Sequence, residues 1–153
     1  MLVLLALMFI GASPTSTGGG VKTTTVGVVF LTLVSMIKGR QEPVVFSRRF
    51  SLGQIMKAVS IISAAISLIF VTTFVISVFE DFEFSALLFE AFSAFGTVGL
   101  SRGITPELSS ASKIALIFTM FGGRVGPLTL LVALTRQKRE DILRYPEEHL
   151  LLG

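Results

Sequence analysis

Long uncharged apolar runs dominate this chain, and neither strand-like alternation nor a heptad repeat organises them. The clearest run extends from Ala58 to Phe79 and lies between Lys57 and the acidic residue Glu80. Its 22 residues would form a helix about 33 Å long, enough to cross the hydrocarbon core of a bilayer. The pattern therefore predicts a transmembrane helix over 58–79.

The N-terminal segment is equally apolar but is interrupted in its middle. Its one charge is Lys22, and the residues before it include Pro14 and the consecutive glycines Gly18–Gly20. Proline and glycine both disfavour a helix interior. We predict a broken transmembrane helix over 1–37, in which a Gly-, Ser- and Thr-rich break over 13–22 joins two half-helices.

A short apolar segment lies between the second and the last long run. Residues 84–95 have the pattern of a helix about 12 residues long, which is too short to cross a membrane. Residues 96–101, which follow, contain two glycines. This arrangement predicts a re-entrant pore helix and loop; a plain turn between two apolar helices is the alternative.

The last apolar run, Ile114–Thr135, contains a single charge, Arg124. It predicts a transmembrane helix over 113–136 with a kink near Pro127. Together the elements predict an all-α integral membrane protein. Its order is a broken transmembrane helix, a transmembrane helix, a re-entrant pore helix with its loop, and a final transmembrane helix.

Composition agrees with a membrane segment and narrows the chemistry. Of the 153 residues 52% are hydrophobic and 15% are charged, against roughly 25% charged residues in soluble domains. The absence of cysteine and the single histidine, His149, exclude a disulfide framework and a thiolate or multi-histidine metal site. The net charge of +3 comes without a nucleic-acid-binding motif, so the expected partner is the lipid bilayer and not nucleic acid.

The basic residues predict the orientation of the chain. Nine of them lie in or beside the segment 38–57 and after the last predicted helix. They are Lys38, Arg40, Arg48, Arg49, Lys57, Arg136, Lys138, Arg139 and Arg144. The opposite side carries Arg102 and Lys113, so the positive-inside rule places the basic loop 38–57 and the C-terminal tail 137–153 in the cytoplasm. The first helix then starts outside, which, with its apolar beginning, predicts a C-terminal piece of a longer protein.

The loop after the short helix has the chemistry of a cation pathway. Backbone at membrane depth must be buried in protein or line water, where its carbonyl groups can replace a cation's hydration shell. The short helix would direct its partially negative C-terminal end toward the loop. Acidic residues would lie at the outer mouth, and these are Glu80, Asp81 and Glu83.

Three charged residues inside apolar segments each leave two interpretations open. Lys22 either lies near the inner end of a water-filled break or belongs to a passive hinge and extends to the membrane interface. Arg124 is either a functional intramembrane arginine or a structural tie to carbonyl groups at a helix kink. Glu90 either hydrogen-bonds the loop from behind or faces water.

Three motifs in this order resemble the Trk/Ktr/HKT potassium transporter superfamily, and in particular its KtrB-like membrane subunits. They are GASPTSTGGGVKTTT at 11–25, FE followed by SAFGTVGLS within 89–101, and GRVGPLT at 123–129. Members have four membrane-pore-membrane repeats around one pore. The resemblance implies that 1–37 is the second helix of the third repeat and that 58–136 is the fourth repeat.

The resemblance also implies roles for individual residues. The selectivity filter would be Thr97, Val98, Gly99 and Leu100, with potassium on the carbonyl groups of Thr97, Val98 and Gly99. The intramembrane gate loop would include Ser16, Thr17, Gly18, Gly19, Gly20 and Lys22. Arg124 would be the arginine that faces this gate, and Glu90 would support the pore helix.

The implied function is potassium transport across the bacterial plasma membrane, with potassium as the transported ion and sodium coupling left open. Implied partners are a second copy in a homodimer and a cytosolic nucleotide-binding ring of the KtrA type, the only route by which a nucleotide would act; no covalent cofactor is expected. An enzyme is not expected, because the deep charges are limited to three. Since one filter segment cannot surround an ion, the alternative is a truncated, non-transporting assembly or regulatory fragment that needs the missing repeats from a partner.

Overall fold

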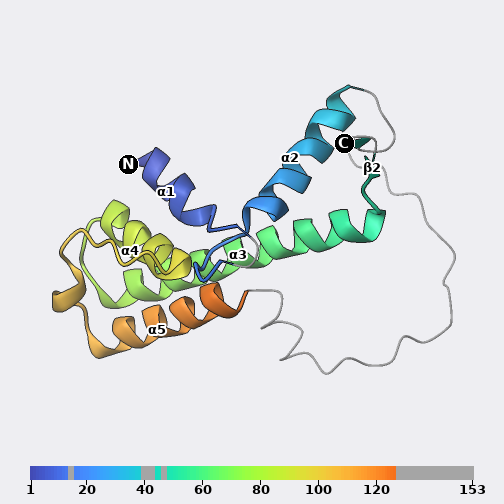
Figure 1. The fold of residues 1–153 in the computed structure, drawn as a ribbon. Helices are drawn as coiled ribbons and strands as arrows, with labels where there is room; N and C mark the ends of the chain where they lie inside the picture. Colours follow the sequence, from blue (N-terminus) through green and yellow to red (C-terminus); the bar gives the residue numbers. More distant parts are fainter. Residues whose placement is uncertain (14–15, 39–43, 46–47, 127–153) are drawn as a thin grey trace, which may run out of the picture.

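A computed structural model describes residues 1–13, 16–38, 44–45 and 48–126 of the chain. Its helices are α1 (Leu2–Phe9), α2 (Thr23–Ile37), α3 (Leu52–Phe79), α4 (Phe84–Gly96) and α5 (Ser110–Val125), with a 3-10 turn at Thr105–Glu107 (Figure 1). A short antiparallel pair, β1 (Val44–Val45) and β2 (Arg48–Arg49), lies between α2 and α3. The predicted all-helical class is confirmed, and the hairpin is an addition within the segment predicted as a loop.

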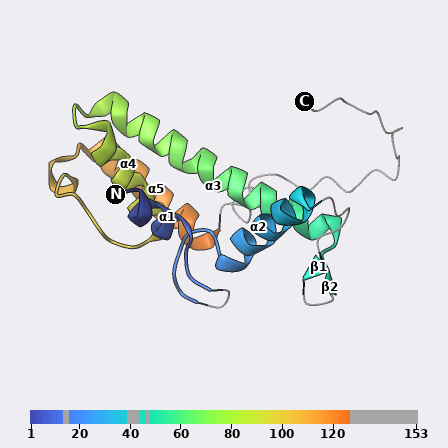
Figure 2. The ribbon, with the colours of Figure 1, turned by 90° about the horizontal axis from the view of Figure 1, so that it is seen from above.

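Helix α3 is the common support of the other helices. It contacts α2, α4 and α5, whereas α1 packs on α4. Figure 2 shows α4 and α5 beside one end of α3, and α2 with the hairpin near its other end. Helices α1 and α2 diverge from the break that joins them, close to the middle of α3 (Figure 1). The break therefore lies where the two halves of the molecule meet.

Helix α3 begins earlier than the charge pattern predicted. The predicted loop 38–57 and helix 58–79 are wrong at their shared boundary, because the helix starts at Leu52. Ser51 and Gln54 form a capping box: the Ser51 hydroxyl accepts the Gln54 N–H, and the Gln54 side chain accepts the Ser51 N–H. With 28 residues α3 is about 42 Å long. Within the described residues it is the one helix both long and apolar enough to cross a membrane.

The other boundaries differ from the predictions by a few residues. The N-terminal segment forms two half-helices, α1 and α2, as the predicted break requires. Helix α5 begins at Ser110, capped by the Ser109 hydroxyl, and ends at Val125, where Gly126 has a φ of 96°. The helix predicted over 113–136 is therefore described only to Val125. The predicted kink at Pro127 and the tail 137–153 lie outside the described residues.

The core is built where α3, α4 and α5 meet. Phe95 of α4 is fully buried, packs with Ile69 of α3 and stacks its ring on Phe9 with 6.0 Å between ring centroids. Nearby, the hydroxyl oxygens of Thr72 and Thr119 lie 2.6 Å apart and join α3 to α5. The outward faces of the helices are apolar; on α3 and α5 they carry Ile66, Phe70, Phe74, Ile117, Phe118 and Phe121, all exposed. Apolar outer faces of this kind are typical of helices in contact with lipid or with further helices.

Candidate functional site

The short helix α4 is buried almost throughout and ends in an unusual turn. Its C-cap, Thr97, has φ 52° and ψ 38° and is the only non-glycine with a positive φ among the described residues. The N–H groups of Thr97 and Val98 donate back to the carbonyl groups of Ala94 and Ser93. The helix thus ends one residue later than the predicted 84–95, and the chain reverses at once. The next residues, Val98 to Leu100, are exposed.

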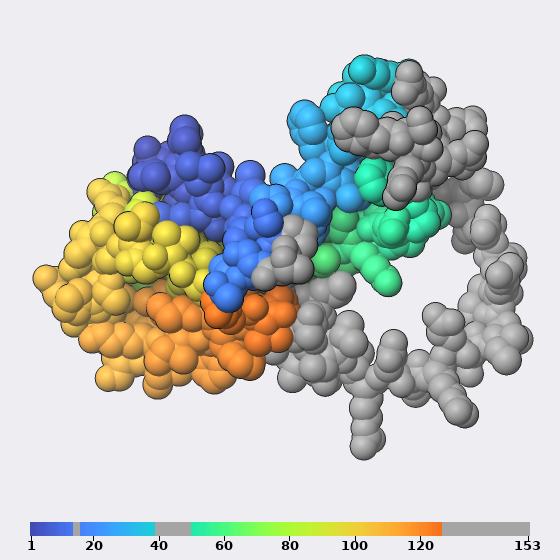
Figure 3. Space-filling model, in the orientation of Figure 1, coloured from blue at the N-terminus to red at the C-terminus, as the bar shows by residue number. Residues whose placement is uncertain are grey.

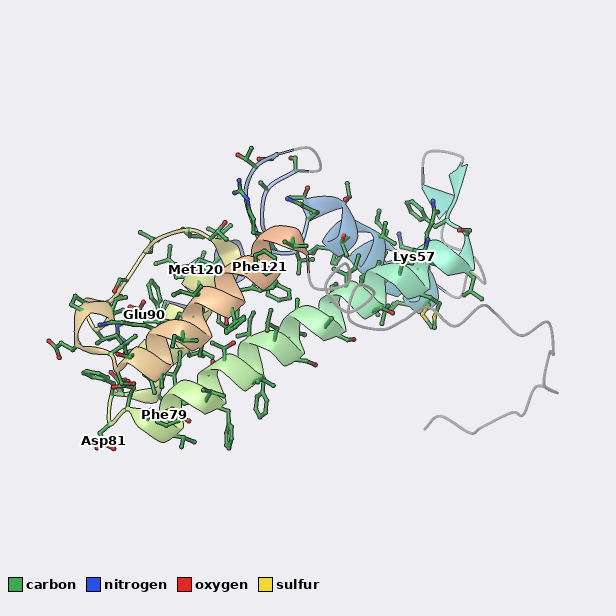
Figure 4. All side chains as sticks on the ribbon, turned by 90° about the horizontal axis from the view of Figure 1, so that it is seen from below. Lys57, Phe79, Asp81, Glu90, Met120 and Phe121 are labelled. Atoms are coloured by element: carbon green, nitrogen blue, oxygen red, sulfur yellow. The ribbon has the colours of Figure 1, made fainter. Side chains whose placement is uncertain are left out.

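Glu90 fixes the far end of this loop. It is only 5% exposed, and its Oε1 accepts hydrogen bonds from the Ser101 hydroxyl at 2.5 Å and from the Arg102 N–H at 3.1 Å. Its Oε2 accepts from the Thr105 hydroxyl at 3.0 Å. Of the two interpretations that the sequence left open, these contacts correspond to the hydrogen-bonded one. Figure 4 shows Glu90 between α4 and the returning chain.

A pocket of about 220 Å³ lies beside the loop. Its walls come from Glu90 and Ser93 on α4, from Leu116 and Met120 on α5, and from the loop residues 99–101. Two of these lining residues, Met120 and Glu90, are labelled in Figure 4. Within the described part of the chain, no group of three acidic, histidine or cysteine side chains could hold a metal ion. The polar chemistry of the loop therefore comes mainly from backbone, hydroxyl groups and one carboxylate.

The break between α1 and α2 is closed by its own backbone. The Gly11 N–H donates to the Val21 carbonyl at 2.7 Å, and the Val21 N–H donates to the Phe9 carbonyl at 3.0 Å. Val21 is almost completely buried in the core beneath α4. Both ends of the break are thereby fixed. Residues Ser16 and Thr17 between them remain exposed.

Three sequence motifs meet at this break. The Gly19 N–H donates to Thr97 Oγ1 at 3.0 Å, and the Gly20 N–H donates to the Gly123 carbonyl at 3.2 Å. The Arg124 guanidinium donates to the carbonyl of Thr17. Figure 3 shows the break, the loop after α4 and the end of α5 side by side on one face. The glycine-rich break, the loop after α4 and the end of α5 are thus in direct contact.

Two cationic side chains bind successive carbonyl groups of the break. The Lys22 ammonium lies 2.7 Å from the Gly18 carbonyl oxygen and 3.4 Å from that of Ser16. Arg124 binds the carbonyl between them, that of Thr17. Arg124 lies in the last turn of α5, where the partially negative end of the helix dipole stabilises a positive charge.

Close approach at these contacts depends on glycine. A Cβ atom on Gly19 would lie 2.7 Å from Thr97 Oγ1, and one on Gly123 would lie 1.9 Å from the Phe95 carbonyl oxygen. Gly123 was not among the predicted site residues. The signal that could have indicated it is the pair of adjacent glycines at 122–123 inside an apolar helix, since small residues there allow close helix packing.

A network of hydrogen bonds and charges joins the ends of α3, α4 and α5. Glu80 Oε1 accepts from the Ser112 hydroxyl and from the Ser109 N–H, both at 2.7 Å. The hydrogen bond from the Ser112 hydroxyl, and then those from Ser109, lower the pKa of Glu80 below its ordinary value. The Arg102 guanidinium donates to the Ser85 hydroxyl at 2.5 Å and lies 3.7 Å from the Glu83 carboxylate. Sequence patterns did not indicate these pairings, because the partners belong to different elements.

Comparison with known proteins gives consistent results. A family model described as TrkH, cation transport protein, matches residues 1–143. The chain is 42% identical over 150 residues to Ktr system potassium uptake protein D of Bacillus subtilis, and 39% identical over 149 residues to protein B of the same system and organism. It is 36% identical over 159 residues to the potassium/sodium uptake protein NtpJ of Enterococcus hirae.

These alignments cover 97–100% of this chain but only 33–35% of each relative, so the chain spans about a third of their length. None of the three relatives is named as an enzyme. The family match covers 143 of the 153 residues, so it confirms the resemblance inferred from the three motifs and the predicted membrane location. This chain belongs to the TrkH family of cation transport proteins.

Proposed function

We propose that this chain forms one part of the ion pathway of a potassium uptake protein in the bacterial plasma membrane. The observation that carries the proposal is the direct contact between the loop after α4, the glycine-rich break and the end of α5. The names of the relatives supply the ion, because they describe potassium uptake and, for NtpJ, uptake of potassium or sodium. The role is that of a passive pathway in which no covalent bond changes.

The loop Thr97–Leu100 would be this chain's segment of the selectivity filter. Its side chains at Val98 and Leu100 are 47% and 48% exposed, so the segment is open on one side. The backbone φ is positive at Thr97 and Gly99 but not at Val98 between them. These φ values give the loop a path that is neither helix nor strand, and such backbone at membrane depth can line a water-filled pathway. Carbonyl groups presented in this way are the ligands that replace water around a potassium ion.

The segment Ser16–Lys22 would be the gate loop, with Arg124 as its obstructing charge. Support comes from the contact of the Arg124 guanidinium with the Thr17 carbonyl and of the Gly19 N–H with Thr97, which place the loop directly beside the proposed filter. The alternative for Arg124, a structural tie, predicts loss of stability without a change in flux. Arg124→Ala should raise potassium flux if the arginine obstructs the path, and unchanged flux in a folded variant would remove that role.

The remaining parts of the pathway must come from elsewhere, because one filter segment cannot enclose an ion. The proposed arrangement is multi-pass, with the basic loop 38–57 and the tail 137–153 in the cytoplasm. There they would be available to a second copy in a homodimer and to a cytosolic nucleotide-binding ring. Two of the relatives are named as proteins of a Ktr system, which supports an assembly of more than one subunit.

A second candidate function is a non-transporting assembly or regulatory fragment. The observation that favours it is the coverage of only about a third of each relative. Both candidates are tested by potassium uptake in a bacterium that lacks its own uptake systems. The chain is expressed alone, together with the part of the Bacillus subtilis protein D that it does not match, and as a chimera in which it replaces the matching third of that protein.

A contribution to the pathway would be supported if the chimera and the co-expressed segments both take up potassium while the chain alone does not. No uptake by any of these, with each protein verified in the membrane, would support the fragment. In the working chimera Gly99→Asp should abolish selective uptake, because it places a carboxylate in the proposed filter at a φ of 78°, where an L side chain is strained. Unchanged selectivity would remove the filter assignment. Sodium is tested in the same assay as a competing ion.

A further inference from the structure

One oxygen atom is shared between the gate loop and the proposed filter. Thr97 Oγ1 accepts the Gly19 N–H at 3.0 Å, and Thr97 is the first of the four filter residues after α4. We infer that the Gly19 N–H and a dehydrated potassium ion compete for this hydroxyl oxygen, so that an ion bound at the inner end of the filter releases the gate loop. The inference rests on the proposed function and adds to it a direct coupling between filter and gate.

The competition follows from the chemistry of the two ligands. A backbone N–H points the positive end of its dipole at the acceptor oxygen, and a cation needs the lone pairs of the same oxygen. Two positive groups directed at one hydroxyl repel each other in a site of low dielectric constant. The loop also packs closely on this side chain, because a single added carbon on Gly19 would lie 2.7 Å from Thr97 Oγ1 and 2.8 Å from its methyl carbon. Binding of the ion and the hydrogen bond from the Gly19 N–H therefore disfavour each other.

The rest of the loop is arranged so that this contact can open alone. Gly20 is tied to the Gly123 carbonyl and Val21 is buried, so the C-terminal side of the loop is anchored in the core. Ser16 and Thr17 are exposed, and their ties are to the ends of two long side chains, Lys22 and Arg124. Long side chains can follow a displaced carbonyl by changing rotamer. The movable portion is thus the segment 16–19.

Thermodynamic linkage makes the coupling reciprocal. If potassium favours the released loop by a given factor, release of the loop increases potassium affinity at Thr97 by the same factor. One net hydrogen bond corresponds to about a fivefold change in an equilibrium constant. We therefore expect effects of about fivefold on loop accessibility, and not an all-or-none response.

The absence of cysteine in this chain makes the loop accessible to a labelling experiment. A Thr17→Cys reporter is placed in the chimera with protein D, from which other cysteines have been removed. The rate of modification by a charged thiol reagent is measured in potassium chloride and in choline chloride at equal ionic strength. A Ser110→Cys reporter at the exposed start of α5, far along the helix from Gly123, is the matched control.

Potassium should accelerate modification of the Thr17→Cys reporter about fivefold and leave the control unchanged. Thr97→Val removes the acceptor at nearly constant volume, so modification should be fast in both salts. Thr97→Ser retains a hydroxyl and should retain the potassium effect. Gly19→Ala should displace the loop by its added carbon and should therefore give the same result as Thr97→Val. It replaces Thr97→Val in the experiment if the Thr97→Val protein does not fold.

The outcomes separate the inference from the proposed function. If the chimera takes up potassium but potassium does not alter modification, or if Thr97→Val keeps the potassium effect, the competition is overturned while the transport role stands. If potassium accelerates modification without uptake, the competition is supported and the transport role is not. If neither uptake nor a potassium effect is found, both are overturned.

Discussion

Gly123 offers a decisive test of how closely α5 approaches α4. Alanine is the best helix former, so replacement of a glycine inside a helix would by propensity alone stabilise the protein by up to about 1 kcal/mol. The structure predicts the opposite sign. The Cβ of Gly123→Ala would lie 1.9 Å from the Phe95 carbonyl oxygen and 2.7 Å from its carbonyl carbon. These are backbone atoms of a fully buried residue, which cannot rotate away.

The magnitude follows from the distance that must be recovered. Ordinary contact begins near 3.4 Å, so α5 and the end of α4 would have to separate by about 1.5 Å. Overpacking of a core costs about 1–3 kcal/mol, and the shift also weakens the hydrogen bond from the Gly20 N–H to the Gly123 carbonyl, worth about 1 kcal/mol. After subtraction of the propensity gain, we expect Gly123→Ala to lower the free energy of unfolding by about 1–3 kcal/mol.

The assay is thermal unfolding of the detergent-solubilised protein followed by circular dichroism at about 222 nm, where helices absorb. Tryptophan fluorescence is not an option, because the chain has no tryptophan. Gly27→Ala is the matched control: Gly27 lies inside α2, and nothing lies within 4 Å of its added Cβ. Its midpoint should stay the same or rise. A Gly123→Ala protein as stable as the original, beside a control that behaves as expected, would refute the close approach of α5 to Phe95.

Three further predictions concern polar contacts. Because the pKa of Glu80 is lowered, its carboxylate stabilises the folded state fully at pH values above its ordinary pKa of 4.5, and this contribution is lost as the pH falls through the pKa of the folded state. Ser112→Ala should raise the pKa of Glu80 in the folded state and so reduce the loss of thermal stability at acidic pH. An unchanged dependence of the unfolding midpoint on pH would contradict this prediction. Thr72→Val should lower the free energy of unfolding by about 1 kcal/mol. Thr119→Val, added to that variant, should lower it by less than about 1 kcal/mol, because the hydrogen bond is already lost, and a double-mutant cycle of unfolding midpoints measures the difference. Strictly additive effects would argue against the 2.6 Å contact between the two hydroxyl groups. Glu90→Gln should lower stability by about 1–3 kcal/mol and reduce uptake, because an amide nitrogen would face hydrogen-bond donors, and a fully active, equally stable variant would exclude a supporting role.

The sequence was most informative where one local property decides the structure. The uncharged run from Ala58 to Phe79 predicted the last 22 of the 28 residues of α3, because a helix of that length can cross a bilayer if it is apolar. The uncharged run did not indicate the start of α3, because Lys57 ends the run but not the helix. A helix starts where a capping residue satisfies its first backbone N–H groups, and a charged residue inside it does not end it. The Ser51 and Gln54 pair was visible in the sequence as a capping box.

The site was only partly predictable for a different reason. Motif resemblance predicts filter, gate-loop and arginine residues, but no local pattern indicates that Gly19 contacts Thr97 or that Gly20 contacts Gly123. Such pairs depend on how α4 and α5 pack around Phe95, which is a property of the whole fold. Lys22 is an example: the sequence indicates a charge near the break or at the membrane interface, but not that its ammonium group binds the carbonyl groups of Ser16 and Gly18.

The long separation of these pairs in the sequence has a consequence for folding during synthesis. The partner of the Gly19 N–H lies 78 residues later, and the partner of the Thr17 carbonyl lies 107 residues later. At about 5–20 residues per second, the glycine-rich break leaves the ribosome roughly 4–20 seconds before those partners exist. Closure of such a long loop is entropically costly and slow. The break therefore cannot complete its hydrogen bonds until α5 has been made.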